Sequence, residues 1–588
     1  MHRTLTKLTL FFGMSLLISA LVANSQNSSI PGQSSEQSAL RRGQTLLAKG
    51  DIAGARTEFE KAVRLAPKSA TAQSALGWVL AQQGDSESAA SHLRNAIHLK
   101  PDFVEPRLTL ASVLAQQGKI AEGEQEARAA VKIAPGDAEA HRTLAKIESQ
   151  SAPENAVAEL KRAAELAPQR ADLKDELGTL FAQGNQFSEA EGAFRDALRL
   201  EPDLASAHFH LGVVELQTQR MDDAVKELNR AVELSPRDAT AHYYLAKALA
   251  AQSKSKEAAE ELRKAATLKP GWFELQVELG VANQRSGDID GAVKAFQEAL
   301  RLHPGDAEIY NDIGLALLQK GDAEGAIPQF KSAVQIKPQD GSLRGNLAIA
   351  YIQLADFDAA VSELDAALKV APANPSLHYD LGLAYKLKDQ LDKAVNEFEE
   401  AIRLQPDLTD AHYTLGILLW QRGEFEKAAA EMRAAIRTQA NYAEAHYMLG
   451  TILKQQGKLQ DSASELQEAI HLQPDFAGAH TTLAGVLRQL GDSDGAALEA
   501  KEGSRIAASV NNLQAATVST NSGKRLLRAG DLEGAIAQFR SAIHSEPKFA
   551  AAHYQLGLAL QQSGEKEEAR KEFQRAGELD PAMSLPVK

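Results

Sequence analysis

A proline that recurs every 34 residues constrains the fold of this chain more than any other feature of its sequence. The series consists of Pro67, Pro101, Pro135, Pro168, Pro202, Pro236, Pro270, Pro304, Pro338, Pro372 and Pro406. Every step is 34 residues except one of 33, and the series continues at Ala440, Pro474, Pro547 and Pro581. A fixed period of this length predicts a repeat protein, in which each unit packs on its neighbours and no independent domains need be counted.

Other positions of the repeat follow the same period when the proline is numbered position 32. Position 8 is Gly or Ala in all sixteen repeats, position 20 is Ala in fourteen and position 27 is Ala in fifteen. Apolar residues spaced by three and four within each half predict two helices, and the small residues predict close contact between them. Gly at position 15 is expected to close the first helix in a left-handed conformation, as at Gly50. The next residue, such as Asp51, is expected to cap the second helix.

This pattern resembles the tetratricopeptide repeat (TPR) family, whose signature is small residues at positions 8, 20 and 27 with Pro at position 32. The resemblance covers residues 36–583 and implies an all-α, right-handed superhelical solenoid of tandem helix-turn-helix repeats. Fourteen repeats are expected over 36–510 and two more over 516–583, followed by a short tail, 584–588. The insertion at 511–515 predicts a hinge. Repeat 4 is one residue short, and Pro153 suits the first turn of its second helix.

The N-terminus has the features of a bacterial export signal. Arg3 and Lys7 precede an apolar run from Leu8 to Val22, and small residues stand before Gln26. The run is shorter than the roughly 20 residues that span a bilayer, so residues 1–25 are predicted to be a cleaved signal peptide, with an uncleaved anchor as the alternative. Residues 26–35 are predicted to be a disordered linker. The mature protein is expected in the periplasm or outside the cell, without a membrane span.

Composition and motifs exclude several classes of function. The chain has no cysteine, which excludes disulfides and thiol chemistry, and its net charge of −14 comes without a basic stripe that would favour nucleic acid. It contains none of the phosphate-loop, dinucleotide, zinc-protease or serine-hydrolase motifs. We therefore expect no catalytic residues, no cofactor and no enzyme activity.

Eight histidines share position 4 of their repeats. They are His141, His208, His242, His378, His412, His446, His480 and His553. Equivalent residues of stacked helices are at least about 8–10 Å apart, whereas metal–nitrogen bonds are about 2 Å, so a metal site is not expected. These histidines are predicted to fill space between paired helices.

The family resemblance implies that positions 2, 5, 6, 9, 12 and 13 of the first helices line a concave groove. Position 5 carries aromatic residues, namely Phe209, Tyr243, Tyr379, Tyr413, Tyr447 and Tyr554. Position 13 is often Gln, as at Gln319, Gln353, Gln421, Gln455 and Gln489. Both side-chain types suit binding of a peptide, although Gln is also a good residue for ending a helix before a glycine turn. The Lys and Asn residues that hold a chaperone's C-terminal carboxylate in some family members are absent from positions 5 and 9.

Two functional hypotheses follow. The first is a non-enzymatic scaffold that binds extended or helical segments of other proteins in the groove, in a cell-envelope assembly or export complex. The second is a detached substrate-recognition or regulatory arm of a separate enzyme such as a glycosyltransferase, whose soluble members resemble this chain in repeat style. Capture of one transferase in stoichiometric yield would favour the second hypothesis.

Overall fold

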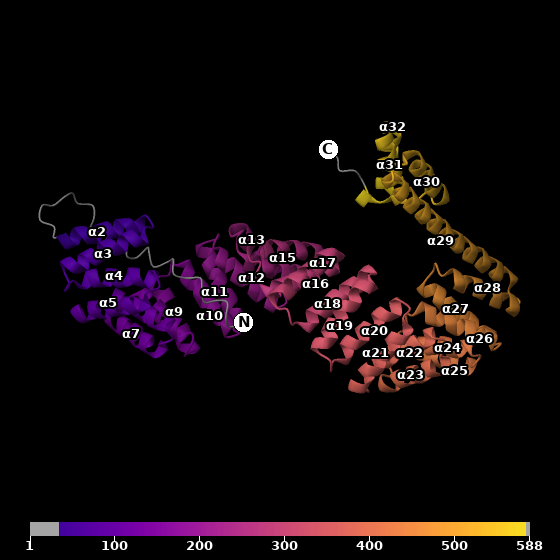
Figure 1. The fold of residues 1–588 in the computed structure, drawn as a ribbon, viewed down its shortest axis with the longest axis horizontal. Helices are drawn as coiled ribbons and strands as arrows, with labels where there is room; N and C mark the ends of the chain where they lie inside the picture. Colours follow the sequence, from indigo (N-terminus) through magenta and orange to yellow (C-terminus); the bar gives the residue numbers. More distant parts are fainter. Residues whose placement is uncertain (1–34, 584–588) are drawn as a thin grey trace. The chain divides into compact units, whose positions relative to one another are not determined.

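The computed structural model describes residues 35–583, and these residues fold into α-helices joined by short turns (Figure 1). They divide into two compact units on either side of the Pro304–Gly305 bond, and each unit is described by itself. The predicted signal peptide, most of the predicted linker and the tail lie outside the described residues. Within residues 35–583 no helix is both long enough and apolar enough to span a bilayer.

The first unit contains helices α2 to α17. Their bounds are α2 (Ser35–Ala48), α3 (Ile52–Leu65), α4 (Ala70–Gln82), α5 (Ser86–Leu99), α6 (Val104–Gln116), α7 (Ile120–Ile133), α8 (Ala138–Glu148), α9 (Pro153–Leu166), α10 (Ala171–Gln183), α11 (Phe187–Leu200), α12 (Ala205–Gln217), α13 (Met221–Leu234), α14 (Ala239–Ala251), α15 (Ser255–Leu268), α16 (Phe273–Ser286) and α17 (Ile289–Leu302).

The second unit contains helices α18 to α32 and a final 3₁₀ turn. Their bounds are α18 (Ala307–Lys320), α19 (Ala323–Ile336), α20 (Gly341–Gln353), α21 (Phe357–Val370), α22 (Pro375–Leu387), α23 (Leu391–Leu404), α24 (Thr409–Gln421), α25 (Phe425–Thr438), α26 (Ala443–Gln455), α27 (Leu459–Leu472), α28 (Ala477–Leu490), α29 (Ser493–Arg528), α30 (Leu532–Ser545), α31 (Ala550–Ser563), α32 (Lys566–Leu579) and η1 (Pro581–Met583).

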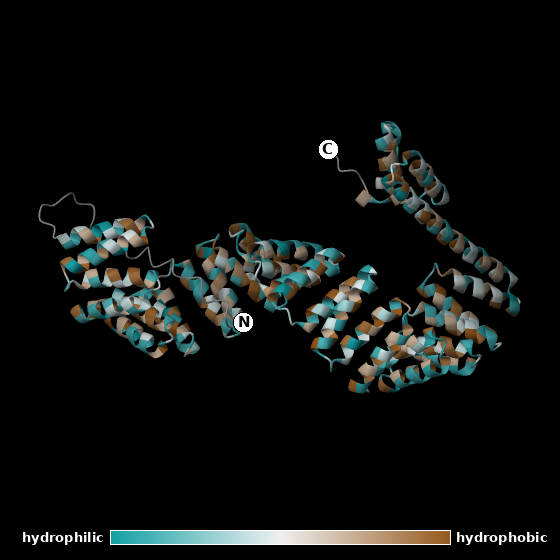
Figure 2. Cartoon of the chain, in the orientation of Figure 1, coloured by the Kyte–Doolittle hydropathy of each residue, from teal (hydrophilic) through white to brown (hydrophobic). Residues whose placement is uncertain are grey.

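Each 34-residue repeat is a pair of helices, as predicted, and the all-α solenoid of tandem helix-turn-helix repeats is confirmed. Repeat 12, for example, consists of α24 and α25, and each such pair also contacts the pair that follows it within its unit. Hydrophobic and hydrophilic residues alternate along the helices (Figure 2). The position-20 and position-27 alanines of repeat 12, Ala428 and Ala435, have no exposed surface, which is why the backbones can approach. Pro153 begins α9, as expected.

The turn between the two helices of a repeat has a left-handed residue at position 15. Ten glycines there have positive φ, as predicted for Gly50, which has φ of 77°. The sequence did not predict that five non-glycine residues adopt the same conformation, namely Asn185, Gln219, Ser253, Ala355 and Asp389. The turn geometry is therefore imposed by the helix pair, and glycine is the residue that adopts it with least strain. Asp51 accepts a hydrogen bond from the Gly54 N–H and caps α3, as expected.

Phe at position 24 occurs only in repeats that have Gly at position 8. All seven repeats with Phe at position 24 have Gly at position 8, whereas the repeats with Ala at position 8 have Leu or Ala at position 24. A Cβ atom added to Gly314 would lie 2.5 Å from Cε1 of Phe330, and Phe330 is fully buried. The phenylalanine ring thus occupies the volume of the missing side chain.

Three positions mark where a stack of repeats begins and ends. Position 3 is buried in every repeat except repeat 1 and repeat 15 (516–549), where Val518 is 64% exposed. Position 10 is apolar except in the same two repeats, which have Thr45 and Arg525. Position 28 is apolar except in repeat 14 (477–510), which has Ser504, and repeat 16 (550–583), which has Gly577. Repeat 14 therefore ends one stack, and repeat 15 begins another.

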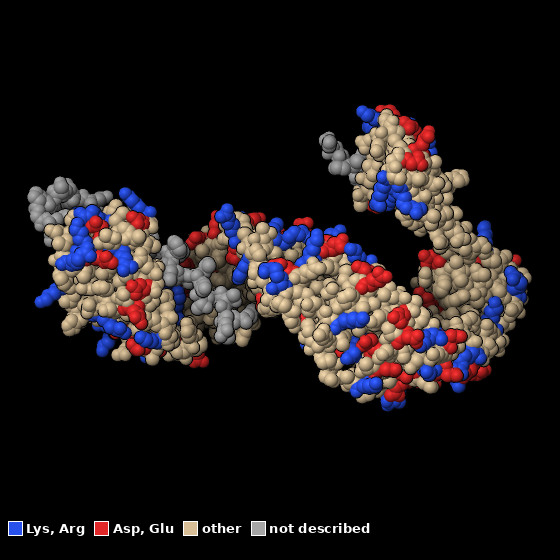
Figure 3. Space-filling view, viewed as in Figure 1, with Lys and Arg blue, Asp and Glu red and all other residues tan. Residues whose placement is uncertain are grey.

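A single helix, α29, joins these two stacks (Figure 1). It contains the second helix of repeat 14, the predicted insertion 511–515 and the first helix of repeat 15. Its middle, residues 507–515, is exposed at every position. The stretch 506–523 contains no ionisable residue, and the middle of this helix is correspondingly tan in Figure 3. The insertion is thus helical, and its action as a hinge stays a prediction.

Candidate protein-binding surface

The first helices present positions 2, 5, 6, 9, 12 and 13 on one side, which we call the first-helix face. In the first unit, Phe209 lies on α12 and Tyr243 on α14. In the second unit, Tyr379, Tyr413 and Tyr447 lie on α22, α24 and α26, in three consecutive repeats. Tyr554 lies apart from these three, on α31 beyond the long helix. These aromatic rings are half-buried, except that of Tyr243, which is 9% exposed.

Three position-5 tyrosines rest on an aromatic residue 29 positions further on, in the turn to the next repeat. The ring centroids of Tyr413 and Tyr442 are 4.9 Å apart, and those of Tyr447 and Phe476 are 4.8 Å apart. Tyr243 and Trp272 form the same contact at 4.7 Å. Such pairs stabilise an orientation of the ring beyond simple burial. The tyrosines are consequently held in place before any partner binds.

Tyr379 and Tyr554 instead contact the position-24 phenylalanine of their own repeat. The centroids of Tyr379 and Phe398 are 5.7 Å apart, and those of Tyr554 and Phe573 are 5.6 Å apart. Burial raises the pKa of Tyr379, and its hydrogen bond with Thr414 of the next repeat opposes that rise. Tyr379 therefore connects two neighbouring first helices as well as contributing to their surface.

A contact between position 5 of one repeat and position 6 of the next recurs along the stacks. In the first unit Arg142 donates from Nε to Glu176 at 2.8 Å, and Asp175 contacts His210 Nδ1 at 2.8 Å. In the second unit the Asn346 amide donates to Asn311 at 2.7 Å. These bonds use up polar groups of the first-helix face in repeats 4–6 and 9–10. These contacts were not predicted from the sequence, although the partners stand 34 or 35 residues apart.

The position-13 glutamines all lie at the C-terminal ends of first helices. Gln319, Gln353, Gln421, Gln455 and Gln489 are exposed. Gln455 accepts a hydrogen bond from Trp420 Nε1 at 2.6 Å, which joins repeats 12 and 13. This row is therefore accessible to a partner, while one of its members also supports the stack. The role of these glutamines in binding stays a prediction.

Two aspartates at position 6 of the second unit lie half-buried on the same face. Burial raises the pKa of Asp312 to about 6, with Glu308 adding to the effect, and burial raises the pKa of Asp380 to about 6. Each carboxylate has lost water, and none of the residues in 35–583 supplies it with a positively charged partner. A cationic group from a binding partner would offset that cost.

The position-4 histidines have a structural role, and the structure shows which groups their two ring nitrogens contact. In each of the eight repeats Nδ1 contacts a glutamate of the second helix at 2.5–2.7 Å, and Nε2 lies 2.9–3.2 Å from the carbonyl oxygen at position 32 of the preceding repeat. Each ring therefore joins the two helices of its repeat to the turn that precedes them. The sequence contained a signal for this pairing, because a glutamate follows each of these histidines by 19 residues, or by 18 in the shortened repeat 4.

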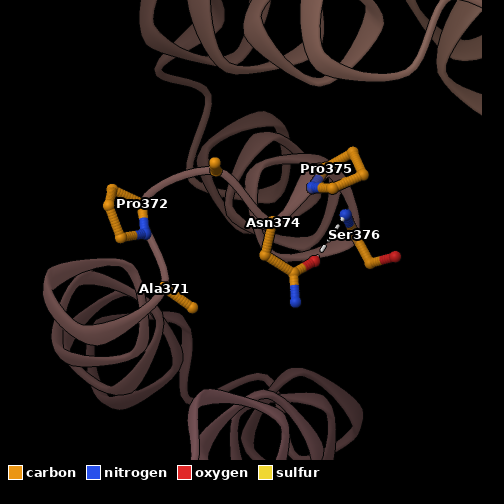
Figure 4. A pocket seen from close by; sticks show the side chains of 6 residues that line it. Ala371, Pro372, Asn374, Pro375 and Ser376 are labelled. Atoms are coloured by element: carbon orange, nitrogen blue, oxygen red, sulfur yellow. Dashed lines mark hydrogen bonds between the residues drawn. The ribbon is translucent and has the colours of Figure 1, made fainter.

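A depression of about 470 Å³ lies on the turn between repeats 10 and 11 and is lined by residues 371–376 (Figure 4). Asn374 accepts a hydrogen bond from the Ser376 N–H there and caps α22. The turn brings none of the predicted binding residues together and carries no ionisable side chain. The first-helix face is therefore the better candidate for function.

Matches to protein-family models decide how this chain is classified. A tetratricopeptide repeat model matches residues 40–102, 176–239, 222–271, 277–341, 447–509 and 520–584, and a second matches 80–147 and 317–381. Two further TPR models match 385–423 and 409–442. The chain belongs to the tetratricopeptide repeat family. TPR stacks form extended binding surfaces for other proteins, so the chain is a protein–protein interaction scaffold.

Several solved structures match parts of the chain at low sequence identity and low TM-score. YrrB, described as a TPR protein with an unusual peptide-binding site, is 22% identical over 30% of this chain and 92% of its own, with a TM-score of 0.30. The hetero-tetramer Cut9–Hcn1 matches at 14% identity over 80% of this chain and 99% of that chain, with a TM-score of 0.34. PilF of Pseudomonas aeruginosa is 20% identical over 37% of this chain and 96% of its own, with a TM-score of 0.32. Comparison with curated proteins gives no match.

Proposed function

We propose that this TPR protein is a non-enzymatic scaffold that binds extended or helical segments of partner proteins on its first-helix face. The observation that carries the proposal is the run of Tyr379, Tyr413 and Tyr447 in consecutive repeats. Their rings are half-buried and held by neighbouring side chains, so little conformational entropy is lost when a partner covers them. Tyrosine also combines contact area with a hydroxyl group that can bond to a peptide.

We further propose that the protein acts after export, in a cell-envelope assembly or export complex. The support is the charged N-terminus, the apolar run and the small residues before Gln26. Cell fractionation and N-terminal sequencing of the mature protein test this part separately. A mature chain that begins at Gln26 is expected, and a cytoplasmic chain that retains residue 1 would contradict it.

Affinity capture from the source cell tests binding at the first-helix face. The triple substitution Tyr379→Ala, Tyr413→Ala and Tyr447→Ala should reduce the recovery of partners while circular dichroism retains the helical content. Tyr385→Ala is a matched control, because Tyr385 is also half-buried on α22 but its ring lies under Lys393 of the second helix, with Nζ 5.0 Å from the centroid. Equal recovery with the triple variant would contradict the proposed surface. Recovery of a single transferase would favour the regulatory-arm hypothesis instead.

A further inference from the structure

Charged side chains on the first-helix face of repeats 11–14 are sorted by sign. An acidic row at positions 2 and 6 consists of Asp380, Asp410 and Glu444. A basic row at position 12 consists of Lys386, Lys454 and Arg488. None of these six side chains forms an ion pair within residues 305–583. On the second helices, by contrast, charged side chains are commonly paired within one helical turn. Arg403, for example, lies 2.6 Å from Glu400.

An apolar row separates the two charged rows. It consists of Leu383 and Ile417 at position 9 and Tyr413 and Tyr447 at position 5, all half-buried. The indole of Trp420 extends it toward the basic side, where its Nε1 donates to Gln455. The first helices α24, α26 and α28 contact one another in sequence, so the rows run along the stack. The surface thus consists of three parallel rows of different chemistry.

The separation of the charged rows indicates the shape of the partner. Positions 2 and 12 are ten residues apart on one helix, which corresponds to about 15 Å at about 1.5 Å per residue. An α-helix with its side chains is about 10–12 Å across, so its two flanks can contact both rows at once. Neighbouring repeats are about 8–10 Å apart, close to the roughly 10.5 Å rise of seven helical residues. Apolar residues in every seventh position of the partner would meet successive repeats.

We infer that repeats 11–14 bind an amphipathic α-helix that has an apolar stripe, a basic flank facing Asp410 and Glu444, and an acidic flank facing Lys386 and Lys454. This inference rests on the proposed function and specifies the partner for the same face. Charge complementarity fixes the two flanks, and the apolar row supplies the contact between them. Such a helix binds in one of its two directions along the stack, because reversal exchanges its flanks.

Designed peptides test this chemistry without knowledge of the natural partner. Three 21-residue helical peptides share a leucine stripe and carry Lys on one flank and Glu on the other, Lys on both flanks, or Glu on both. Fluorescence anisotropy with the full mature chain should show that the mixed peptide binds about fivefold more tightly than either uniform peptide, as expected from a few exposed charge pairs. Equal affinities for all three, or no binding, would overturn the inference.

A charge-reversed protein provides the decisive comparison. The double variant Lys386→Glu, Lys454→Glu makes the position-12 row mainly acidic, with Arg488 left positive, and should shift the preference to the peptide with Lys on both flanks. Thermal unfolding should stay unchanged, because neither lysine has an ion-pair partner among the described residues. Unchanged peptide preference would overturn the inference. If cellular partners still depend on the three tyrosines in that case, the proposed function stands and only the description of the partner fails.

Discussion

Nδ1 of His412 on the first helix of repeat 12 lies 2.6 Å from Oε2 of Glu431 on the second helix of the same repeat. Its Nε2 lies 3.1 Å from the carbonyl oxygen of Pro406, at the end of the repeat before. The bond to Glu431 raises the pKa of His412 above its ordinary value, although burial and Arg437 oppose the rise. One side chain therefore joins both helices of a repeat to the preceding turn.

The first prediction is that this pair stabilises repeat 12 in a pH-dependent way. The folded pKa lies above the unfolded value of about 6.5, so the stabilisation is complete below about pH 6.5 and is lost as pH rises through the folded pKa. Glu431→Gln should lower hydrogen-exchange protection of α24 and α25 by about 1–2 kcal/mol at pH 5.5, and by less at pH 8.5. An equal loss at both pH values would contradict a pH-dependent bond between His412 and Glu431.

Repeat 10 provides the matched control for that measurement. Arg344 occupies the histidine position there and donates to Glu363 at 2.8 Å. Because a guanidinium does not titrate in this range, Glu363→Gln should cost a similar amount at both pH values. A pH-dependent loss in repeat 10 would show that the effect does not come from the histidine.

The second prediction concerns the close contact between Gly314 and Phe330. Gly314→Ala places a Cβ atom against a fully buried ring and should cost about 1–3 kcal/mol of local stability. Adding Phe330→Leu should recover part of this loss, because repeats with Ala at position 8 have Leu or Ala at position 24. Differential scanning calorimetry and hydrogen exchange measure both effects. Additive losses in the double variant would contradict the steric explanation.

The third prediction uses the left-handed turn of repeat 10. Ala355 has φ of 58°, a conformation that costs an L-residue with a Cβ about 1–2 kcal/mol. Ala355→Gly should stabilise the repeat by about 0.5–1 kcal/mol, since glycine gives up part of the gain through its larger unfolded-state entropy. Gly321→Ala at the same position of repeat 9, where φ is 83°, should have the opposite effect. Two changes of the same sign in thermal unfolding would show that the turn is not under this constraint.

The fourth prediction concerns Glu215, which is 2% exposed and has one carboxylate oxygen without a hydrogen-bond partner. Burial raises its pKa to about 7, and the nearby charge of Glu227 adds to the rise. The folded state therefore favours the protonated form, and stability falls as pH rises from about 4.5 to 7. Glu215→Gln should stabilise repeat 6 by about 1–3 kcal/mol at pH 8 and by little at pH 4.5. A destabilised variant at pH 8 would contradict this.

The 34-residue period was sufficient to predict every helix pair, because proline, glycine and small residues act locally and in the same place in each repeat. Pro153 at the start of α9 shows how far this local chemistry extends. The pairing of His412 with Glu431 was missed because single positions were considered instead of positions 19 residues apart. The insertion at 511–515 became part of a helix. Loss of the proline at Ala508 does not explain this alone, because repeat 12 has Ala440 at the same position and its second helix still ends at Thr438. The packing of Tyr413 on Tyr442 depends on tertiary geometry and was beyond the sequence pattern.

Site-specific photocrosslinking in the source cell tests the central claim most directly. A photoreactive residue at the exposed Gln421 on the first-helix face should crosslink to a partner protein. The same residue at Arg403, whose side chain is 67% exposed on a second helix, should not. Mass spectrometry would then identify the partner and the contacted segment. Crosslinks from Arg403 alone, or equally from both sites, would contradict binding at the first-helix face.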